Sequence, residues 1–269
     1  MQVIKYKWEN FEPFLIVSGM ERIRLFNSEI NATVGAKRCA GFVLDGRHAE
    51  CSVKLDYGSQ CNGCLLRDKF AMCFRCTGKE CINEKRRGDC TDEQYFIYLA
   101  AFNSVLKVGI SLDRRFQERL IEQGADFGAI VGRVKDGLIV RQIEQRIAST
   151  LGIVDRVRGD EKKRMLFCDP NKAITNIRQA IHKLKADFPR YMIPPQIFDM
   201  RMHYRLHNVP LYPKDVSITD DTELTGNIVA AKGNIIVIEN GEFSAFNVHE
   251  LLGREIELKK VKSLTSPKN

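Results

Sequence analysis

Eight of the nine cysteines in this chain of 269 residues fall within one short stretch, and this clustering limits how that stretch can fold. The eight are Cys39, Cys51, Cys61, Cys64, Cys73, Cys76, Cys81 and Cys90. Between positions 39 and 90 glycine, charged residues and cysteine dominate, so the stretch has too few apolar side chains for an ordinary core. Bound metal is the usual substitute. The cysteines therefore predict a metal-stapled region.

The spacing of the cysteines predicts zinc as the metal. Two Cys-x-x-Cys pairs, CNGC and CFRC, are present, and each can supply two thiolates to tetrahedral Zn²⁺ from one tight turn. Eight thiols suit two structural Zn²⁺ sites with four cysteines each. We favour a sequential division, in which the first site takes the four cysteines from Cys39 to Cys64 and the second takes those from Cys73 to Cys90, because the second group is so compact.

Other arrangements of the same cysteines are possible. Both Cys-x-x-Cys pairs could share one zinc ion, which would leave Cys39, Cys51, Cys81 and Cys90 for the other. An iron–sulfur cluster also accepts four thiolates. His48 could replace one cysteine as a ligand. Cys168 lies apart from the eight and is predicted to be a small buried residue.

The charge balance favours a polyanionic partner. Lys and Arg number 42 against 34 Asp and Glu, a formal net charge of +8, and nucleic acid, DNA or RNA, is the first candidate. Three basic clusters could follow phosphates or simply face water: Lys85-Arg86-Arg87, Arg156-Val157-Arg158 and Lys162-Lys163-Arg164.

The distribution of apolar residues predicts a cytoplasmic protein with no membrane partner. No apolar run approaches the length of a membrane-spanning helix. The first residues, MQVIKYKWENFEPF, do not resemble a signal peptide. In a reducing compartment clustered cysteines are metal ligands more often than disulfides.

Hydrophobic periodicity predicts an α+β chain. Strands are expected in residues 1–38, in YFIYLAA and in VLKVGIS. Ser111 is predicted to cap a helix that ends at Gly124, followed by a strand over 127–135 and helices over 138–151 and 171–187. β structure is expected in residues 196–269. Two of its strands are joined at Asn240-Gly241, and a further strand is expected in REIELKKVKSL.

The segment 95–150 resembles the GIY-YIG nuclease fold. The motif residues are Ile97-Tyr98, then Lys107-Val108-Gly109-Ile110-Ser111, then an arginine-bearing helix, then Glu144. The whole chain is similar to an uncharacterised prokaryotic family, domain-of-unknown-function family 2797, which joins a cysteine-rich half to a GIY-YIG-like core and a C-terminal β module. The residues that carry this similarity are the ordered cysteines, YLAAF, RRFQERLIEQGAD, RQIEQRI, VPLYPKD and TGNIVAAKGNIIVIENGEFSAFNV.

The nuclease resemblance implies roles for five residues. Glu144 would bind Mg²⁺ or Mn²⁺, Arg115 or Arg119 would hold the scissile phosphate, Tyr98 would orient or deprotonate water, and Lys107 would act as a base or contact phosphate. The sequence departs from the motif in three places. Phe96 precedes Ile97-Tyr98 where glycine is usual, Lys107 replaces the second tyrosine, and Ser111 stands where threonine is usual.

Each of these residues also has an ordinary structural interpretation. Glu144 could pair with Arg141 or Arg146 on its own helix, and Arg115 and Arg119 could pair with Glu118 and Glu122. Tyr98 could pack in the core, and Lys107 could be a surface lysine.

Together these patterns predict a zinc-containing nucleic-acid-binding protein that could be a metal-dependent endonuclease. The alternative is a non-catalytic module that binds RNA or a ribonucleoprotein with the same fold. The expected organisation is an N-terminal β segment (1–38), a zinc-binding cysteine-rich region (39–94), a GIY-YIG-like core with a trailing helix (95–190) and a small C-terminal β module (191–269).

Overall fold

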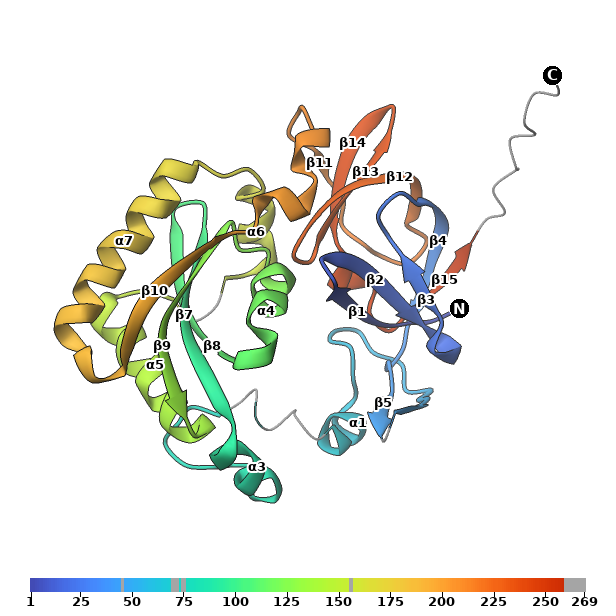
Figure 1. The fold of residues 1–269 in the computed structure, drawn as a ribbon. Coiled ribbons are helices and arrows are strands. Elements are labelled where there is room, and N and C mark those ends of the chain that lie inside the picture. The colour runs from blue at the N-terminus through green and yellow to red at the C-terminus, as the bar shows by residue number, and fades with distance from the viewer. Residues whose placement is uncertain (45, 69–72, 74–75, 155–156, 259–269) are drawn as a thin grey trace.

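The computed structural model describes residues 1–44, 46–68, 73, 76–154 and 157–258 (Figure 1). The chain is of mixed α+β class, with four antiparallel or mixed sheets in the described ranges. Two larger bodies are visible in Figure 1, one built on the core sheet with its helices and one built mainly of β strands, and the cysteine-rich segments lie along one end of both.

The core sheet has four antiparallel strands in the order β10-β9-β7-β8. Its strands are β7 (Gln94–Phe102), β8 (Val105–Leu112), β9 (Phe127–Lys135) and β10 (Met192–Asp199). Helix α4 (Phe116–Gln123) packs on one face through Phe116 and Leu120, against Tyr98. Helices α5 (Gly137–Leu151) and α7 (Pro170–Asp187) cover the other face. Because side chains alternate along a strand, adjacent β7 residues belong to different cores.

The β body joins the two ends of the chain. A six-stranded sheet has the order β11-β14-β13-β12-β4-β15. Its strands are β4 (Glu29–Lys37), β11 (Lys214–Asp215), β12 (Glu223–Lys232), β13 (Ile235–Asn240), β14 (Glu242–Asn247) and β15 (Arg254–Leu258). A smaller sheet of β1 (Val3–Glu9), β2 (Glu12–Val17) and β3 (Arg22–Arg24) packs with it. The N-terminal β segment therefore shares its hydrogen bonding and core with the C-terminal one.

The remaining elements are short. The cysteine-rich stretch holds β5 (Phe42–Leu44), β6 (Arg47–Ala49), α1 (Asn62–Arg67), η2 (Glu84–Arg86) and α3 (Arg87–Asp92). Helix α6 (Gly159–Arg164) lies between the core and the β body. Single 3₁₀ turns are η1 (Ser18–Met20), η3 (Asp113–Arg115), η4 (Pro189–Tyr191), η5 (Arg201–Tyr204), η6 (Leu206–Asn208) and η7 (Val248–Leu251).

Three local predictions from the sequence differ from the structure. Ser111 lies inside β8 and its hydroxyl donates to the Leu112 carbonyl, so it caps no helix. The segment predicted as two strands around Asn240-Gly241 forms three, because the chain also turns at Gly233-Asn234 between β12 and β13. Residues 192–199, expected to open the C-terminal β module, instead join the core sheet as β10, an edge strand whose register shifts across its two prolines.

Candidate functional site

The first cysteine group forms a compact cluster. One sulfur atom from each of Cys39, Cys51, Cys61 and Cys64 lies within 4.8 Å of all the others. The Sγ atoms of Cys51 and Cys61 are 3.9 Å apart. A tetrahedral zinc ion with Zn–S bonds of about 2.3 Å sets its sulfurs roughly 3.8 Å apart, whereas a disulfide needs about 2.05 Å. These four cysteines could therefore hold one metal ion.

Backbone groups prepare this cluster for a metal. Cys39 follows β4, and its sulfur accepts hydrogen bonds from the N–H groups of Gly41 (3.4 Å) and Cys61 (3.2 Å). The backbone N–H of Cys64 lowers the pKa of Cys61 to about 7, which favours the thiolate that binds metals, whereas burial raises the pKa of Cys39 and Cys64. His48 lies with its Nε2 atom 2.7 Å from the carbonyl oxygen of Ala40. That contact engages a ring nitrogen of His48 with the backbone, and the cluster consists of four cysteines without it.

The second cysteine group is anchored to the core. Cys73, Cys76, Cys81 and Cys90 all line one pocket of about 190 Å³, together with Tyr95 and Arg141. The side-chain amide of Asn83 donates to Cys73 Sγ (3.3 Å), and the Tyr95 hydroxyl donates to Cys90 Sγ (3.8 Å). A Cβ atom at Gly137, the first residue of α5, would lie 2.4 Å from Cys90 Sγ. Only glycine leaves room for that thiol.

An ion pair ties the second group to the start of α5. Arg87 donates through both of its terminal nitrogens to the Asp136 carboxylate, at 2.7 and 2.6 Å. Asp136 also accepts the N–H of Leu138 as the N-cap of α5. The hydrogen bond from Arg87 is the main reason that the pKa of Asp136 lies below its usual value.

The first four cysteines are brought together as the sequential division predicts, whereas among the described residues the second four share a pocket without forming a comparably compact cluster. The CNGC pair belongs to the cluster beside β4, and the CFRC pair lines the pocket beside α5. The rival arrangement, with both pairs on one metal ion, is wrong because the two pairs belong to different parts of the molecule.

A basic pocket of about 610 Å³ lies between the core and the β body. Its cationic lining comes from three segments: Lys107 on β8, Arg119 on α4, and Arg158 and Lys162 at and within α6. No Asp or Glu is among the described residues that line it. Arg156, which the sequence groups with Arg158, is outside the described residues.

The β body supplies the polar wall of this pocket. Lys162 donates to the side-chain oxygen of Asn234 (3.1 Å), and Asn234 donates to that of Asn247 (2.7 Å). His249 also lines the pocket. Burial, and then the charge of Lys162, lower the pKa of His249 to about 4, so the ring is neutral at pH 7.

Tyr98 lies behind the pocket. Its side chain is 1% exposed, and its hydroxyl accepts a hydrogen bond from the Gln123 amide at 2.8 Å. Burial raises the pKa of Tyr98, while Arg119 acts against that shift. Gly109 on β8 lets the ring lie flat, since a Cβ atom there would be 2.5 Å from the hydroxyl oxygen.

One buried acceptor at the pocket has no partner. Gln123 lines the pocket, and its Oε1 atom is buried without a hydrogen bond to any described residue. Buried polar atoms are nearly always satisfied in folded proteins. The pocket therefore combines four cations with the polar side chains of Gln123, Asn234 and Asn247.

The five residues predicted from the nuclease resemblance do not all meet. Lys107 and Arg119 line the pocket, and Tyr98 contacts it through Gln123. Arg115 is exposed and pairs with Glu118 and Glu122. Glu144 is 3% exposed and pairs with Arg141, one turn earlier on α5, although its charge still raises the pKa of Tyr98.

Several pocket residues have no local sequence signal. Arg158 and Lys162 belong to basic clusters that are visible in the sequence. Asn234 lies in the β12–β13 turn, Asn247 ends β14 and His249 lies in η7, and only the tertiary fold brings them to the pocket.

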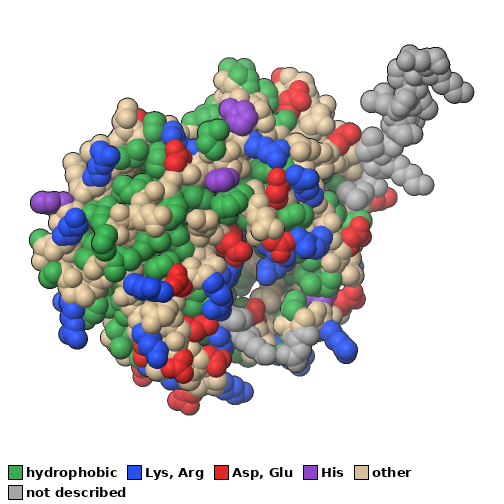
Figure 2. Space-filling model, in the orientation of Figure 1, with side chains coloured by type: hydrophobic (Ala, Val, Ile, Leu, Met, Phe, Trp, Pro, Cys, Tyr) green, Lys and Arg blue, Asp and Glu red, His purple; other side chains and the backbone are tan. Residues whose placement is uncertain are grey.

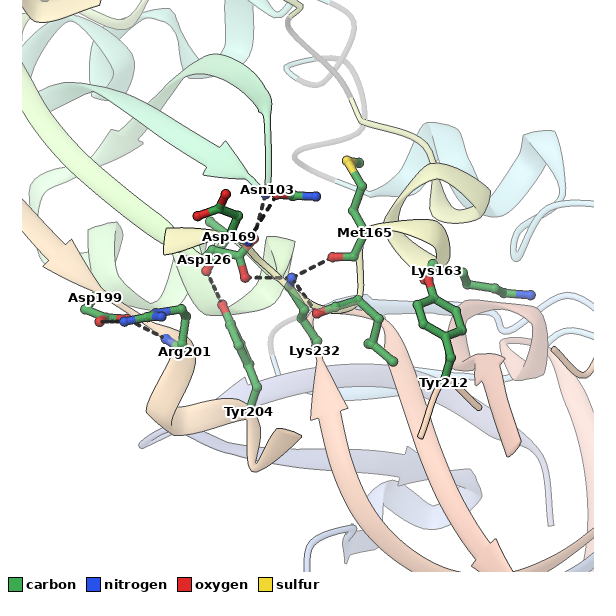
Figure 3. A network of polar contacts seen from close by, with 12 residues as sticks. Asn103, Asp126, Lys163, Met165, Asp169, Asp199, Arg201, Tyr204, Tyr212 and Lys232 are labelled. Atoms are coloured by element: carbon green, nitrogen blue, oxygen red, sulfur yellow. Dashed lines mark hydrogen bonds and ion pairs between the residues drawn. The ribbon is translucent and has the colours of Figure 1, made fainter. Parts of the chain in front are cut away.

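A buried ion pair fixes the walls of the pocket relative to one another (Figure 3). Lys232, at the end of β12, lies 2.7 Å from Asp126 and also donates to the carbonyl oxygens of Met165 (2.8 Å) and Leu166 (2.9 Å), just after α6. Asp126 in turn accepts the backbone N–H of Asn103 in the β7–β8 turn (2.7 Å). The exposed fractions of Lys232 and Asp126 are 4% and 1%. One buried ammonium group thus joins the core sheet, the α6 segment and the β body.

Surface charge elsewhere is mixed. Figure 2 shows one face, on which Lys and Arg side chains are interspersed with Asp and Glu and form no continuous basic area. The pocket, rather than the overall charge, therefore marks a candidate anion site. In the described part of the chain, no helix combines the length and the apolar character needed to cross a bilayer.

Comparison with known proteins places the chain in a family. The model of the family described as "Protein of unknown function (DUF2797)" matches residues 29–256. No curated protein and no solved structure matches the chain. The chain belongs to this family.

Proposed function

We propose that this member of the family binds nucleic acid by placing backbone phosphates in the basic pocket. The observation that supports this proposal most is the convergence of Lys107, Arg119, Arg158 and Lys162 on one pocket whose described lining has no carboxylate. Charge-assisted hydrogen bonds from such groups to phosphate oxygens are strong, and two of the four are guanidinium groups that can pair bidentately.

The polar lining of the pocket can contact more of a nucleotide than its phosphate. Asn234 and Asn247 line the pocket beside the cations, and their amide groups can donate to or accept from a sugar hydroxyl or a base. The proposed ligand is DNA or RNA, free or within a ribonucleoprotein.

A matched pair of variants on one helix tests the proposal. Arg119→Gln removes a pocket cation, and Arg115→Gln removes an exposed cation of the same charge one turn away. Fluorescence anisotropy with labelled RNA and DNA oligonucleotides should show a roughly 5- to 20-fold loss of affinity for Arg119→Gln and less than a two-fold loss for Arg115→Gln. Equal losses would show that the pocket is not the binding site.

Endonuclease activity is the second candidate. Tyr98, Lys107 and Arg119 lie close together in the order that the GIY-YIG resemblance implies, and the charge of Glu144 acts on the Tyr98 phenol. Glu144 would hold Mg²⁺ or Mn²⁺, which would stabilise charge on the scissile phosphate. For that, the Glu144 carboxylate must leave Arg141, and the raised pKa of Tyr98 makes its phenol a poor base. Binding without cleavage therefore fits the geometry better.

Incubation with labelled nucleic acid and Mg²⁺ or Mn²⁺ separates the two candidates. Under the binding proposal no oligonucleotide is cut. Divalent-dependent cleavage that Glu144→Ala abolishes, while affinity stays the same, would establish the nuclease.

We also propose that each cysteine group holds one zinc ion. The support for the first site is the spacing of about one Zn²⁺ coordination sphere; for the second it is only that its four cysteines line one pocket, and they would have to draw closer together around the ion. Elemental analysis should give two zinc ions per chain. A single zinc would restrict metal to one group, and iron with visible absorbance would indicate an iron–sulfur cluster instead.

A further inference from the structure

Two exposed aromatic rings lie beside α6. Tyr212 is 57% exposed and Phe167 is 36% exposed, with their ring centroids 5.6 Å apart and their planes at 66°. The neighbouring Leu211 is 70% exposed. These side chains form an exposed apolar patch.

The two rings are held in place from both sides. The Tyr212 hydroxyl donates to the carbonyl oxygen of Lys163 on α6. Pro210 and Pro213 flank the Leu211-Tyr212 dipeptide and restrict its backbone. Phe167 follows Leu166, whose side chain is 1% exposed and whose carbonyl oxygen accepts from Lys232. A ligand that stacks on these rings would lose little protein entropy, because the rings are already ordered.

The patch and the basic pocket share α6. Arg158, Gly159 and Lys162 of this segment line the pocket, whereas Lys163 is bonded to Tyr212. The two features are therefore separated by one helix, on the order of 10 Å. A short stretch of extended single strand can cover that distance.

The charge around the patch suits the same polyanion. Arg164, whose side chain is 75% exposed, lies on α6, and the exposed Lys214 follows Pro213. The acids on and beside α6 are engaged: Asp160 pairs with Arg164, Asp215 pairs with Lys163, and Glu161 accepts the backbone N–H of Arg158. Cations next to exposed aromatic rings are the combination that single-strand binders use.

We infer that the protein takes single-stranded nucleic acid, with a phosphate in the basic pocket and a neighbouring base stacked on one ring of the Tyr212–Phe167 pair and in edge contact with the other. This inference rests on the proposed function and makes it more specific. A base in a duplex is already stacked and has no free face for a ring, so the patch selects unpaired bases. Stacking is tolerant of base identity, and binding depends little on sequence.

An abasic oligonucleotide, which keeps the phosphates and lacks the bases, tests the stacking inference. Binding of the full chain is measured by anisotropy for a labelled single-stranded oligothymidylate, for an abasic oligonucleotide of equal length and for a duplex. The wild-type chain should bind the oligothymidylate about ten-fold or more tightly than the abasic strand. Tyr212→Ala and Phe167→Ala should remove most of that preference without changing abasic binding.

Two control variants isolate stacking from folding. Tyr212→Phe keeps the ring and loses the hydrogen bond to Lys163, and it should retain the preference for bases. Met202→Ala changes an exposed apolar residue (75% exposed) outside the patch and should have no effect. Equal affinity for based and abasic strands, unchanged in Tyr212→Ala, would overturn the stacking inference and leave the phosphate pocket intact. Failure to bind any of the three ligands would overturn the proposed function itself.

Discussion

The cysteine groups and the basic pocket differ in how the chain builds them. Each cysteine group comes from one continuous stretch, beside β4 or beside α5. The pocket draws on β8, α4, α6 and the β body, which are far apart in the sequence. Figure 1 shows α1 and α3 of the cysteine-rich stretch at one end of the molecule and α4 and α6 near its middle. The conspicuous motif thus supports the structure, whereas the proposed binding site is made by the tertiary fold.

Loss of a cysteine ligand should have the largest effect. Cys61→Ser removes a thiolate from the first cluster, and loss of a structural metal should lower the free energy of unfolding by about 5 kcal/mol or more. Thermal unfolding and zinc content measure this. Cys168→Ser, outside both groups, is the control and should change neither. Retention of all zinc and of the wild-type melting temperature in Cys61→Ser would contradict the assignment.

Loss of the buried Lys232–Asp126 ion pair, which joins the core sheet to the β body, should have the second-largest effect on stability. Lys232→Met leaves the Asp126 carboxylate buried without its cation, at a cost of about 3–5 kcal/mol. Because this pair also positions α6, nucleic-acid affinity should fall although no pocket residue has changed. The double variant Lys232→Met with Asp126→Asn should recover part of the stability, since no lone charge remains. Chemical denaturation of both variants measures the difference. Equal stability of the single variant and the wild type would contradict the claim that the Lys232–Asp126 pair stabilises the junction between the core and the β body.

The ion pair beside the second cysteine group should have a smaller, pH-dependent effect. Asp136→Asn should cost about 1–3 kcal/mol at pH 7, with nucleic-acid affinity unchanged. The pKa of Asp136 is lower in the folded chain than its usual 3.8, so the unfolded chain binds the proton more tightly. The contribution is therefore complete above about pH 5 and is lost progressively as the pH falls from 3.8 through the lower pKa of the folded state. Denaturation at several pH values checks this, and a difference that does not shrink at all between pH 7 and about pH 2 would contradict it.

The sequence predicted local features better than distant contacts. The strands that became β7, β8 and β9 and the helices α5 and α7 follow from periodicity within each segment. The first cysteine cluster, from Cys39 to Cys64, follows from spacing. Lys107 and Arg119 were identified through a motif whose residues are close in sequence.

What the sequence did not predict depends on tertiary pairing. Two prolines obscured β10, which tolerates them only because it is an edge strand. The pairing of β4 with β12 and β15 has no local signal. The ordinary interpretations of Glu144, Arg115 and Arg119, as partners of nearby carboxylates or cations, are the ones that the structure shows, although Arg119 also lines the pocket.

The central claim is that phosphates occupy the basic pocket, and the salt dependence of binding tests it most directly. Affinity for a single-stranded oligonucleotide is measured across salt concentrations for the wild-type chain and for a variant with Lys107, Arg119, Arg158 and Lys162 all replaced by Gln. Each phosphate contact contributes roughly 0.7 to the slope of log affinity against log salt. The account predicts a slope about two to three units shallower in the variant, and an unchanged slope would contradict it.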